Sequence, residues 1–279
     1  MTSAMFCTKL DLIYGMKKKN MMKKRIQNLT LALTCAATVM GASSCDIDNK
    51  ENVNIYYANA VVTVKPLRDS NPSFYMQLDD STTLVAENIS QSPFGDKEVR
   101  ALAALEITGE DAGIYDKVAY VYAIDSILTK NTVPFEDSKT ADSMYGTDPV
   151  EMIGDWMTVV EDGYITLRVR VATSTLGATH KLSLLTGVNP DDPYEVEFRH
   201  KYDGPMISDI HSPSCVLGDA LVAFRLDSLP DTQGETVKLT LKWKSFRGER
   251  MAIFDYCTDA ASGGAIQIED GASFLTNIK

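Results

Sequence analysis

Cys45 is the residue of this sequence whose surroundings point to a definite reaction. It directly follows Gly41-Ala42-Ser43-Ser44, and a cysteine behind such small residues resembles a bacterial lipobox. In a lipobox the cysteine thiol is the nucleophile that receives the lipid, and the chain is cut just before it. We therefore expect lipidation of Cys45. The alternative is an ordinary cleavage near Ala42, with Cys45 incidental.

The segment before Cys45 has the order of a secretory signal peptide: basic, then apolar, then small residues. Its basic cluster spans Lys17–Arg25, and the apolar run that follows is shorter than the ~20 residues of a membrane-spanning helix. Residues 1–44 are predicted to be this signal, with an over-extended start because Met1–Gly15 adds no basic cluster. Residues 45–54 are then a lipidated tether that holds the protein at the outer membrane, on the cell-surface or periplasmic face.

Two further cysteines remain in the mature chain, Cys215 and Cys257. Outside the reducing cytosol a disulfide between them would persist, and closing a loop of this length stabilises a fold by on the order of 4 kcal/mol in the entropic treatment. Two buried thiols are the alternative, since a reduced cysteine packs as a small hydrophobe. The sequence leaves both open.

Other chemistry-bearing residues occur without a pattern that joins them. The sequence has no glycine-rich phosphate loop, no nucleophile elbow and no CxxC pair, and its histidines lie on different predicted elements, away from ligand spacing: His180, His200 and His211. The acidic pairs Asp79-Asp80 and Asp191-Asp192 could bind a cation or a sugar hydroxyl. Asp, Asn and Pro also build tight turns, and we favour turns for both pairs. We expect no catalytic residue, no metal and no cofactor.

Aromatic residues beside carboxylates allow a second interpretation of function. Trp156 with Asp155, or Tyr194 with Asp191-Asp192, could stack on and hydrogen-bond to a sugar ring. The protein would then be a carbohydrate-binding or glycan-processing accessory lipoprotein. In a β-sandwich, however, a tryptophan usually fills the core, and we expect this of both Trp156 and Trp243.

A period of two dominates the chain from residue 56 onward and predicts an all-β protein. Five short strands between turn residues indicate an OB-like β-barrel over residues 55–130. Residues 131–149 are polar and lose the period, so they are predicted to be a linker. About seven further strands indicate a β-sandwich over residues 150–279, with an Asp162-Gly163 hairpin turn. Gly218-Asp219 is read as a connecting turn, and helix is expected only as a turn or two near 213–217.

The charge of the mature chain argues against nucleic acid and anionic lipid as partners. Without the seven basic residues and one acidic residue of 1–44, 20 basic residues stand against 37 acidic ones, a net −17. Binding to a phosphate backbone needs clustered Lys and Arg, and no such cluster interleaves with the aromatics of the predicted barrel. Tyr120 and Tyr122 share one face of their strand, so we expect them to pack as a pair, in the core or against the second domain.

Three segments carry a resemblance to the NigD-like lipoprotein family of Bacteroides and its relatives: "YYANAVVTVKPL", "FYMQLDDSTTLVAEN" and "YVYAIDSILTK". The "DWMTVVEDGYITLRVRV" segment is similar in pattern. The resemblance implies an N-terminal OB-like domain and a C-terminal β-sandwich. The family is named after a bacteriocin operon, and a bacteriocin-immunity role has been suggested for it, but it brings no established activity and no functional residue.

In the same bacteria O-glycans are attached at Asp-Ser/Thr followed by a small or aliphatic residue. This chain has similar sites at Ser81, Ser126, Ser143 and Ser228, although Asp-Ser is also ordinary turn chemistry. Taken together, the sequence predicts a lipid-anchored envelope protein, attached to the membrane through Cys45. It would work without catalysis, by binding a protein or glycan or by shielding.

Overall fold

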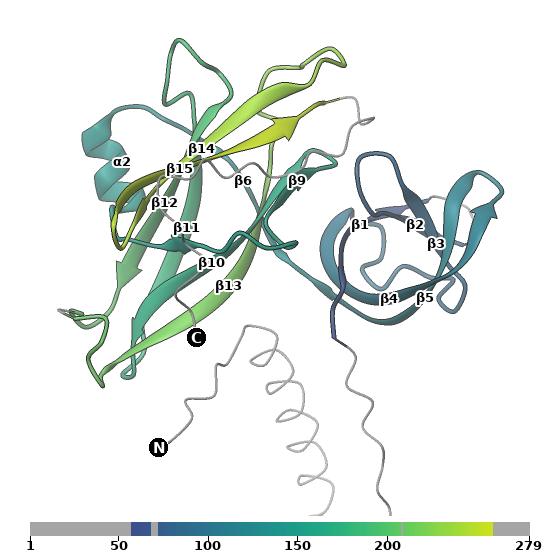
Figure 1. Cartoon of the computed structure of the whole chain (residues 1–279), viewed down its shortest axis with the longest axis horizontal. Coiled ribbons are helices and arrows are strands. Elements are labelled where there is room, and N and C mark those ends of the chain that lie inside the picture. Colours follow the sequence, from purple (N-terminus) through teal and green to yellow (C-terminus); the bar gives the residue numbers. More distant parts are fainter. Residues whose placement is uncertain (1–56, 68–71, 208, 259–279) are drawn as a thin grey trace, which may run out of the picture. The chain divides into compact units, whose positions relative to one another are not determined.

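The computed structural model describes residues 57–67, 72–207 and 209–258. The predicted signal peptide, Cys45 and the tether therefore lie outside the described residues. Within them the chain is built almost wholly of β-strands, with one short helix (Figure 1). None of the described helical segments has the length and hydropathy that a transmembrane helix requires.

The first five strands form a closed barrel in the order β1-β2-β3-β5-β4, as the OB-like interpretation predicts. The strands are β1 (Ala60–Pro66), β2 (Phe74–Gln77), β3 (Thr83–Ala86), β4 (Val99–Ala112) and β5 (Tyr115–Ser126). β1 closes the barrel by pairing antiparallel with both β2 and β4, and β3 pairs parallel with β5. Alternate side chains such as Val62, Val64 and Met76 fill the interior, because successive residues of a strand face opposite sides of the sheet.

Two sheets form the sandwich that follows. One has the order β6-β13-β10-β8, with β9 added onto β10, and the other has the order β15-β14-β12-β11-β7. The first sheet contains β6 (Leu128–Asn131), β8 (Glu151–Met152), β9 (Val159–Glu161), β10 (Tyr164–Ser174) and β13 (Cys215–Arg225). The second contains β7 (Val133–Pro134), β11 (Thr179–Thr186), β12 (Glu195–Asp203), β14 (Val237–Ser245) and β15 (Gly248–Tyr256). The predicted sandwich is confirmed.

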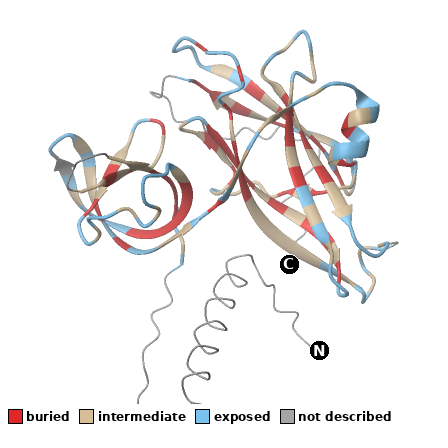
Figure 2. Cartoon of the chain, turned by 180° about the vertical axis from the view of Figure 1, so that it is seen from behind, coloured by how far each residue is buried: buried red, intermediate tan, exposed pale blue. Residues whose placement is uncertain are grey.

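Buried side chains from both sheets meet in one core, which Figure 2 shows as the red segments of the strands. β14 illustrates how the sequence dictates this. Leu239, Leu241 and Trp243 are buried, whereas Lys238 before them and Lys244 after them are exposed. The strand therefore has the inward and outward faces that its alternation predicts.

The predicted Asp162-Gly163 turn is confirmed by strand register and backbone angles. Glu161 pairs with Tyr164, which leaves a two-residue loop between β9 and β10. Asp162 has φ 50° and Gly163 has φ 73°, and positive φ at both central residues is the geometry of a type I′ hairpin turn.

The structure corrects the prediction of a linker over residues 131–149, because these residues belong to the sandwich. β6 begins at Leu128, inside the predicted barrel, and pairs parallel with β13; β7 pairs parallel with β11. Helix α2 (Ser138–Tyr145) follows and contacts β11 and β12. A two-residue strand is too short to show a period, and α2 buries only Ala141, so its sequence has no apolar stripe to reveal it.

Two smaller expectations about β13 are also wrong. No helix occurs at 213–217: turn residues lead into β13, which begins at Cys215. Gly218-Asp219 is not a turn but the middle of this strand, where Gly218 pairs with Val171 and Asp219 with Arg170. The carboxylate of Asp219 accepts hydrogen bonds from Arg168 and Arg170 of the neighbouring strand, which is why an Asp is accommodated inside a strand.

Candidate functional site

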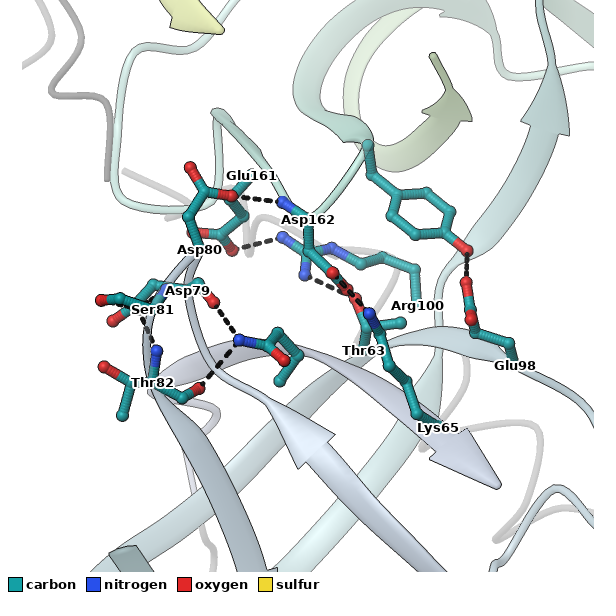
Figure 3. A network of polar contacts seen from close by, with 12 residues as sticks. Thr63, Lys65, Asp79, Asp80, Ser81, Thr82, Glu98, Arg100, Glu161 and Asp162 are labelled. Atoms are coloured by element: carbon teal, nitrogen blue, oxygen red, sulfur yellow. Dashed lines mark hydrogen bonds and ion pairs between the residues drawn. The ribbon is translucent and has the colours of Figure 1, made fainter. Parts of the chain in front are cut away.

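A network of buried polar side chains lies where the barrel meets the sandwich (Figure 3). We call it the junction clamp and define it as Lys65, Asp80, Arg100, Glu161 and Asp162. Lys65, Asp80 and Arg100 come from the barrel, and Glu161 and Asp162 come from the β9–β10 hairpin of the sandwich.

Arg100 is the centre of the junction clamp, and its side chain is completely buried. Its guanidinium donates from Nε to Oγ1 of Thr166 at 3.2 Å and from Nη1 to Oγ1 of Thr63 at 3.0 Å, and Nη2 forms an ion pair with Glu161. A buried charge is tolerated only when it is paired and hydrogen-bonded. Arg100 meets this condition only because the barrel supplies Thr63 and the sandwich supplies Thr166 and Glu161.

The hairpin turn supplies the other half of the junction clamp. The backbone N–H of Asp162 donates to Oδ1 of Asp80 at 2.6 Å, and the ammonium of Lys65 lies 2.6 Å from Oδ1 of Asp162. Burial raises the pKa of the Asp80 and Glu161 carboxyls above their ordinary values, and in Glu161 the Arg100 charge opposes that rise.

Tyr164 packs beside the junction clamp in a small apolar cluster with Val61, Leu102, Ile127 and Ala223. Its hydroxyl donates to Oε1 of Glu98 at 2.6 Å. Two guanidinium groups flank its ring, that of Arg100 at 5.8 Å and that of Arg225 at 5.0 Å from the centroid. Burial raises the pKa of Tyr164, so its phenol stays protonated and remains a donor.

Perturbed carboxyl groups often mark catalytic sites, but structural ion-pair networks perturb pKa values too. Here the carboxylates of Asp80, Glu161 and Asp162 each accept from an N–H group across the junction. The arrangement therefore holds the barrel and the sandwich together as one body. It is a structural device, and the sequence did not show that these residues come together, because they lie in four separate segments.

The structure shows a second site that the sequence did not predict: a pair of stacked histidines. His180 on β11 and His200 on β12 have ring centroids 5.2 Å apart, and Nδ1 of His180 lies 2.9 Å from Nε2 of His200. His200 Nδ1 lies 3.1 Å from the carbonyl oxygen of Pro149, which can only accept. His200 therefore carries its proton on Nδ1, and His180 must donate its own Nδ1 proton to Nε2 of His200.

Burial lowers the pKa of both imidazoles, and the neighbouring His200 charge lowers that of His180 further. The pair is neutral at neutral pH and connects β11 and β12 to the segment after α2. A hollow of about 360 Å³ opens beside His200 and is lined by Thr147, Asp148, Glu197, Phe198, Arg199, His200, Lys244 and Glu249. Arg199 is paired there with Glu197. In the described part of the chain, no three His, Cys, Asp or Glu side chains gather as a metal site would need.

Cys215 and Cys257 are not joined by a disulfide. Cys215 begins β13, whereas Cys257 follows Tyr256, whose hydroxyl reaches the carbonyl of Leu226 just beyond the other end of β13. An eleven-residue strand spans about 33 Å at ~3.3 Å per residue, and a disulfide needs Cα atoms within about 7 Å. Strand direction thus places the two thiols far apart, and buried Cys257 accepts a hydrogen bond from Thr232.

The acidic pairs are turns, as favoured. Oδ1 of Asp79 accepts from the backbone N–H of Ser81 and Thr82, and Oδ1 of Asp192 accepts from that of Tyr194. Asp80 has the additional part in the junction clamp described above.

The aromatic predictions have a mixed outcome. Trp243 is in the core, but Trp156 is 48% exposed, because it sits in the irregular segment between β8 and β9 rather than on a strand face. Asp155 beside it is engaged by Arg168. Tyr120 and Tyr122 do pack as a pair, with ring centroids 4.9 Å apart, yet they lie on the outer surface of the barrel and not in a core.

The four candidate glycosylation residues are all exposed: Ser81, Ser126, Ser143 and Ser228.

An OB-type barrel followed by a β-sandwich and joined to it by a buried clamp defines a class of two-domain β proteins. Residues 61–127 match the NigD-like N-terminal OB domain, and residues 131–256 match the NigD-like C-terminal beta sandwich domain. The chain belongs to the NigD-like family. Both halves of the match agree with the resemblance seen in the sequence.

Solved structures include similar proteins from related bacteria. A protein of Parabacteroides distasonis described as toxin-related is 32% identical, with a TM-score of 0.54 over 72% of this chain and 93% of that one. A protein of unknown function from Bacteroides vulgatus is 17% identical, with a TM-score of 0.54 over 73% and 93%. A NigD-like immunity protein from Bacteroides caccae is 17% identical, with a TM-score of 0.46 over 78% and 100%. No curated protein matches the chain.

Proposed function

We propose that this chain is a lipid-anchored protein of the cell envelope that acts without catalysis, by binding a partner or shielding the membrane. The observation that carries the proposal is the basic, apolar and small-residue segment that ends at Cys45. The fold supports it, because its buried charged groups join the domains and His180 and His200 are hydrogen-bonded to each other and to backbone.

Replacing Cys45 with Ala tests the anchor. A single acyl chain binds a bilayer only marginally, whereas two or more hold a protein stably, so we expect the wild type in the outer-membrane fraction and Cys45→Ala in the soluble fraction. Cys215→Ala is the matched control, because it removes a cysteine without touching the lipobox. Intact mass of the wild type should show the lipid; an unmodified chain cut near Ala42 would contradict the anchor.

The partner proposed here is a bacteriocin or a similar toxin, against which the protein gives immunity. The family's operon context and the toxin-related description of the Parabacteroides protein support this choice. A deletion strain should become sensitive to culture supernatant of a toxin-producing neighbour, and the wild-type gene, but not Cys45→Ala, should restore resistance. Unchanged sensitivity of the deletion strain across a panel of producers would contradict the immunity role.

A carbohydrate-binding role is the second candidate, favoured by the exposure of Trp156. An exposed indole can stack on a sugar ring, although both oxygens of the adjacent Asp155 are occupied, by Arg168 and by the N–H of Met157. Glycan-array binding that is lost in Trp156→Ala and kept in Trp243→Phe would support this role over immunity.

Two further properties belong to the proposal. O-glycans on the exposed serines would be seen as added mass, first at Ser143, which lies on the solvent side of α2. Nucleic acid is not a partner: the barrel region 53–130 has six basic and eleven acidic residues, and single-strand binding by OB folds relies on a basic groove. Salt-sensitive micromolar binding of single-stranded DNA in an anisotropy assay would contradict this.

A further inference from the structure

One end of the sandwich exposes large apolar side chains on neighbouring loops. Leu176 is 84% exposed in the loop between β10 and β11, Met206 is 93% exposed in the segment after β12, and Val216 is 49% exposed at the start of β13. We call these three residues the apolar tip. Figure 1 shows both loops at the lower end of the sandwich.

Two contacts show that the residues of the apolar tip are neighbours. The backbone N–H of Thr175 donates to the carbonyl of Ser214 at 3.0 Å, which places Leu176 next to the start of β13. A Cβ added to Gly204 would lie 2.7 Å from Cβ of Ala178, so the loop of Met206 lies against the loop of Leu176. The apolar tip is therefore one surface and not three separate exposures.

Charge is absent from the residues next to Leu176 and Met206, although the mature chain is strongly acidic and Asp203 and Asp209 flank Met206. Residues 174–179 and 204–207 contain no Asp, Glu, Lys or Arg. A contact surface of this kind avoids the repulsion that the net −17 of the mature chain would meet at an anionic membrane. It suits the apolar and zwitterionic part of a phospholipid bilayer.

The direction of β1 shows at which end of the sandwich the described chain begins. Ala58, just before β1, packs on the same cluster as Leu221 in the middle of β13, while Lys65 near the end of β1 pairs with Asp162. β1 therefore runs toward the Asp162 end of the sandwich. The chain enters it from the opposite end, where β13 begins and the apolar tip lies.

The length of the tether permits both attachments at once. From Cys45 to Tyr57 the chain has twelve steps, which reach at most about 40 Å when extended. The distance along β13 from Leu221 to the apolar tip is six residues, about 20 Å. The reach exceeds the distance, so an anchor at Cys45 and the apolar tip can touch the same bilayer at once.

We propose that the apolar tip rests in the phospholipid bilayer that holds the anchor, with the side chains of Leu176 and Met206 inserted at the boundary between headgroups and acyl chains. This inference rests on the proposed lipidation of Cys45. The occupant is lipid, and the contact fixes the orientation of the molecule on the membrane rather than its affinity alone.

Depth-dependent quenching tests the proposal on the lipidated full chain. Leu176→Trp and Met206→Trp are reconstituted into zwitterionic vesicles whose acyl chains carry bromine, which quenches only indole that reaches the lipid. Glu235→Trp is the matched control, an exposed turn at the opposite end of the sandwich, near Thr232 and Thr258. Native Trp156 and Trp243 are subtracted with the unsubstituted protein.

We expect the added tryptophan to be quenched at least twofold more strongly at positions 176 and 206 than at 235. Adding Leu176→Asp to Met206→Trp should reduce that quenching, because a carboxylate draws the loop away from lipid. Equal quenching at all three positions in protein that co-floats with the vesicles overturns the proposal while the anchor stands. Protein that does not co-float contradicts the anchor itself, and the proposal falls with it.

Discussion

At the scale of single residues, the histidine pair is the feature that responds to pH. His180, His200 and the carbonyl of Pro149 form a relay that needs both imidazoles neutral, because a proton on Nε2 of His200 would remove its acceptor. The charged or titratable groups that face the pair are Asp148 and Tyr202. The relay is satisfied at neutral pH and is lost in acid.

The sign of the pH effect follows from the direction of the two shifts. Burial holds the pKa of His180 and His200 below the ordinary value of 6.5, so the unfolded chain takes up protons first. Stability from the pair is complete above that value and decreases as the pH falls below it, by at most about 1.4 kcal/mol per pH unit for each proton. The raised carboxyls of Asp80 and Glu161 act in the opposite sense.

We therefore predict that the free energy of unfolding falls less between pH 7.5 and pH 5.5 in the double variant His180→Gln/His200→Asn than in the wild type. Urea denaturation at each pH measures it. His211→Asn, at an exposed histidine outside the pair, should keep the wild-type slope. An unchanged slope in the double variant would show that the relay is not the acid-sensitive group.

At the scale of elements, helix α2 is held by one close approach of the backbone. Gly146 ends the helix with φ +79°, and a Cβ there would lie 2.6 Å from the carbonyl oxygen of His200 and from Cα of Lys201. Only glycine permits both the angle and the contact. We predict that Gly146→Ala lowers stability by about 2 kcal/mol or more.

Gly218→Ala is the control for this prediction. Gly218 lies inside β13 without a positive φ and with no atom within 4 Å of an added Cβ, so its effect should stay within about 0.5 kcal/mol. Thermal melts of both variants, followed by circular dichroism, make the comparison. Equal melting temperatures would mean that α2 is free to shift away from β12.

The sequence predicts the long strands well because each carries its own signal. β14 alternates between buried and less buried residues over most of its length, and the Asp162-Gly163 turn joins β9 to β10. β6, β7 and α2 carry no such signal, since their place is set by partners far along the chain. The histidine pair depends on the register of β11 against β12, which no spacing within the sequence shows.

At the scale of the whole molecule, the junction clamp makes two domains into one cooperative body. Removing one partner of a buried ion pair costs about 3–5 kcal/mol, because the other charge is left uncompensated. We predict a loss of this size for Arg100→Met and, with it, separation of the single denaturation transition into barrel and sandwich steps. Tryptophan fluorescence reports the sandwich, which contains both tryptophans, and far-ultraviolet circular dichroism reports the sum.

Arg225→Met is the matched control for Arg100→Met. Arg225 also lies over the Tyr164 ring, but its side chain is partly exposed and its pair with Glu98 is long, at 3.5 Å. Such a pair contributes about 0–1 kcal/mol. Adding Glu161→Gln to Arg100→Met should recover part of the loss, and equal losses in the two arginine variants would contradict a special role for Arg100.

The parallel pairing of β6 with β13 also has a kinetic consequence. All barrel strands lie between residues 60 and 126, so the barrel can close as soon as that segment is free to fold. β6 follows at once, yet its partner Val222 arrives only much later in the chain, and pairings between distant segments form slowly. The barrel should therefore fold first, before the sandwich is complete. In the meantime β6 and β7 remain unpaired and prone to aggregation, until the strands that complete their sheets have formed.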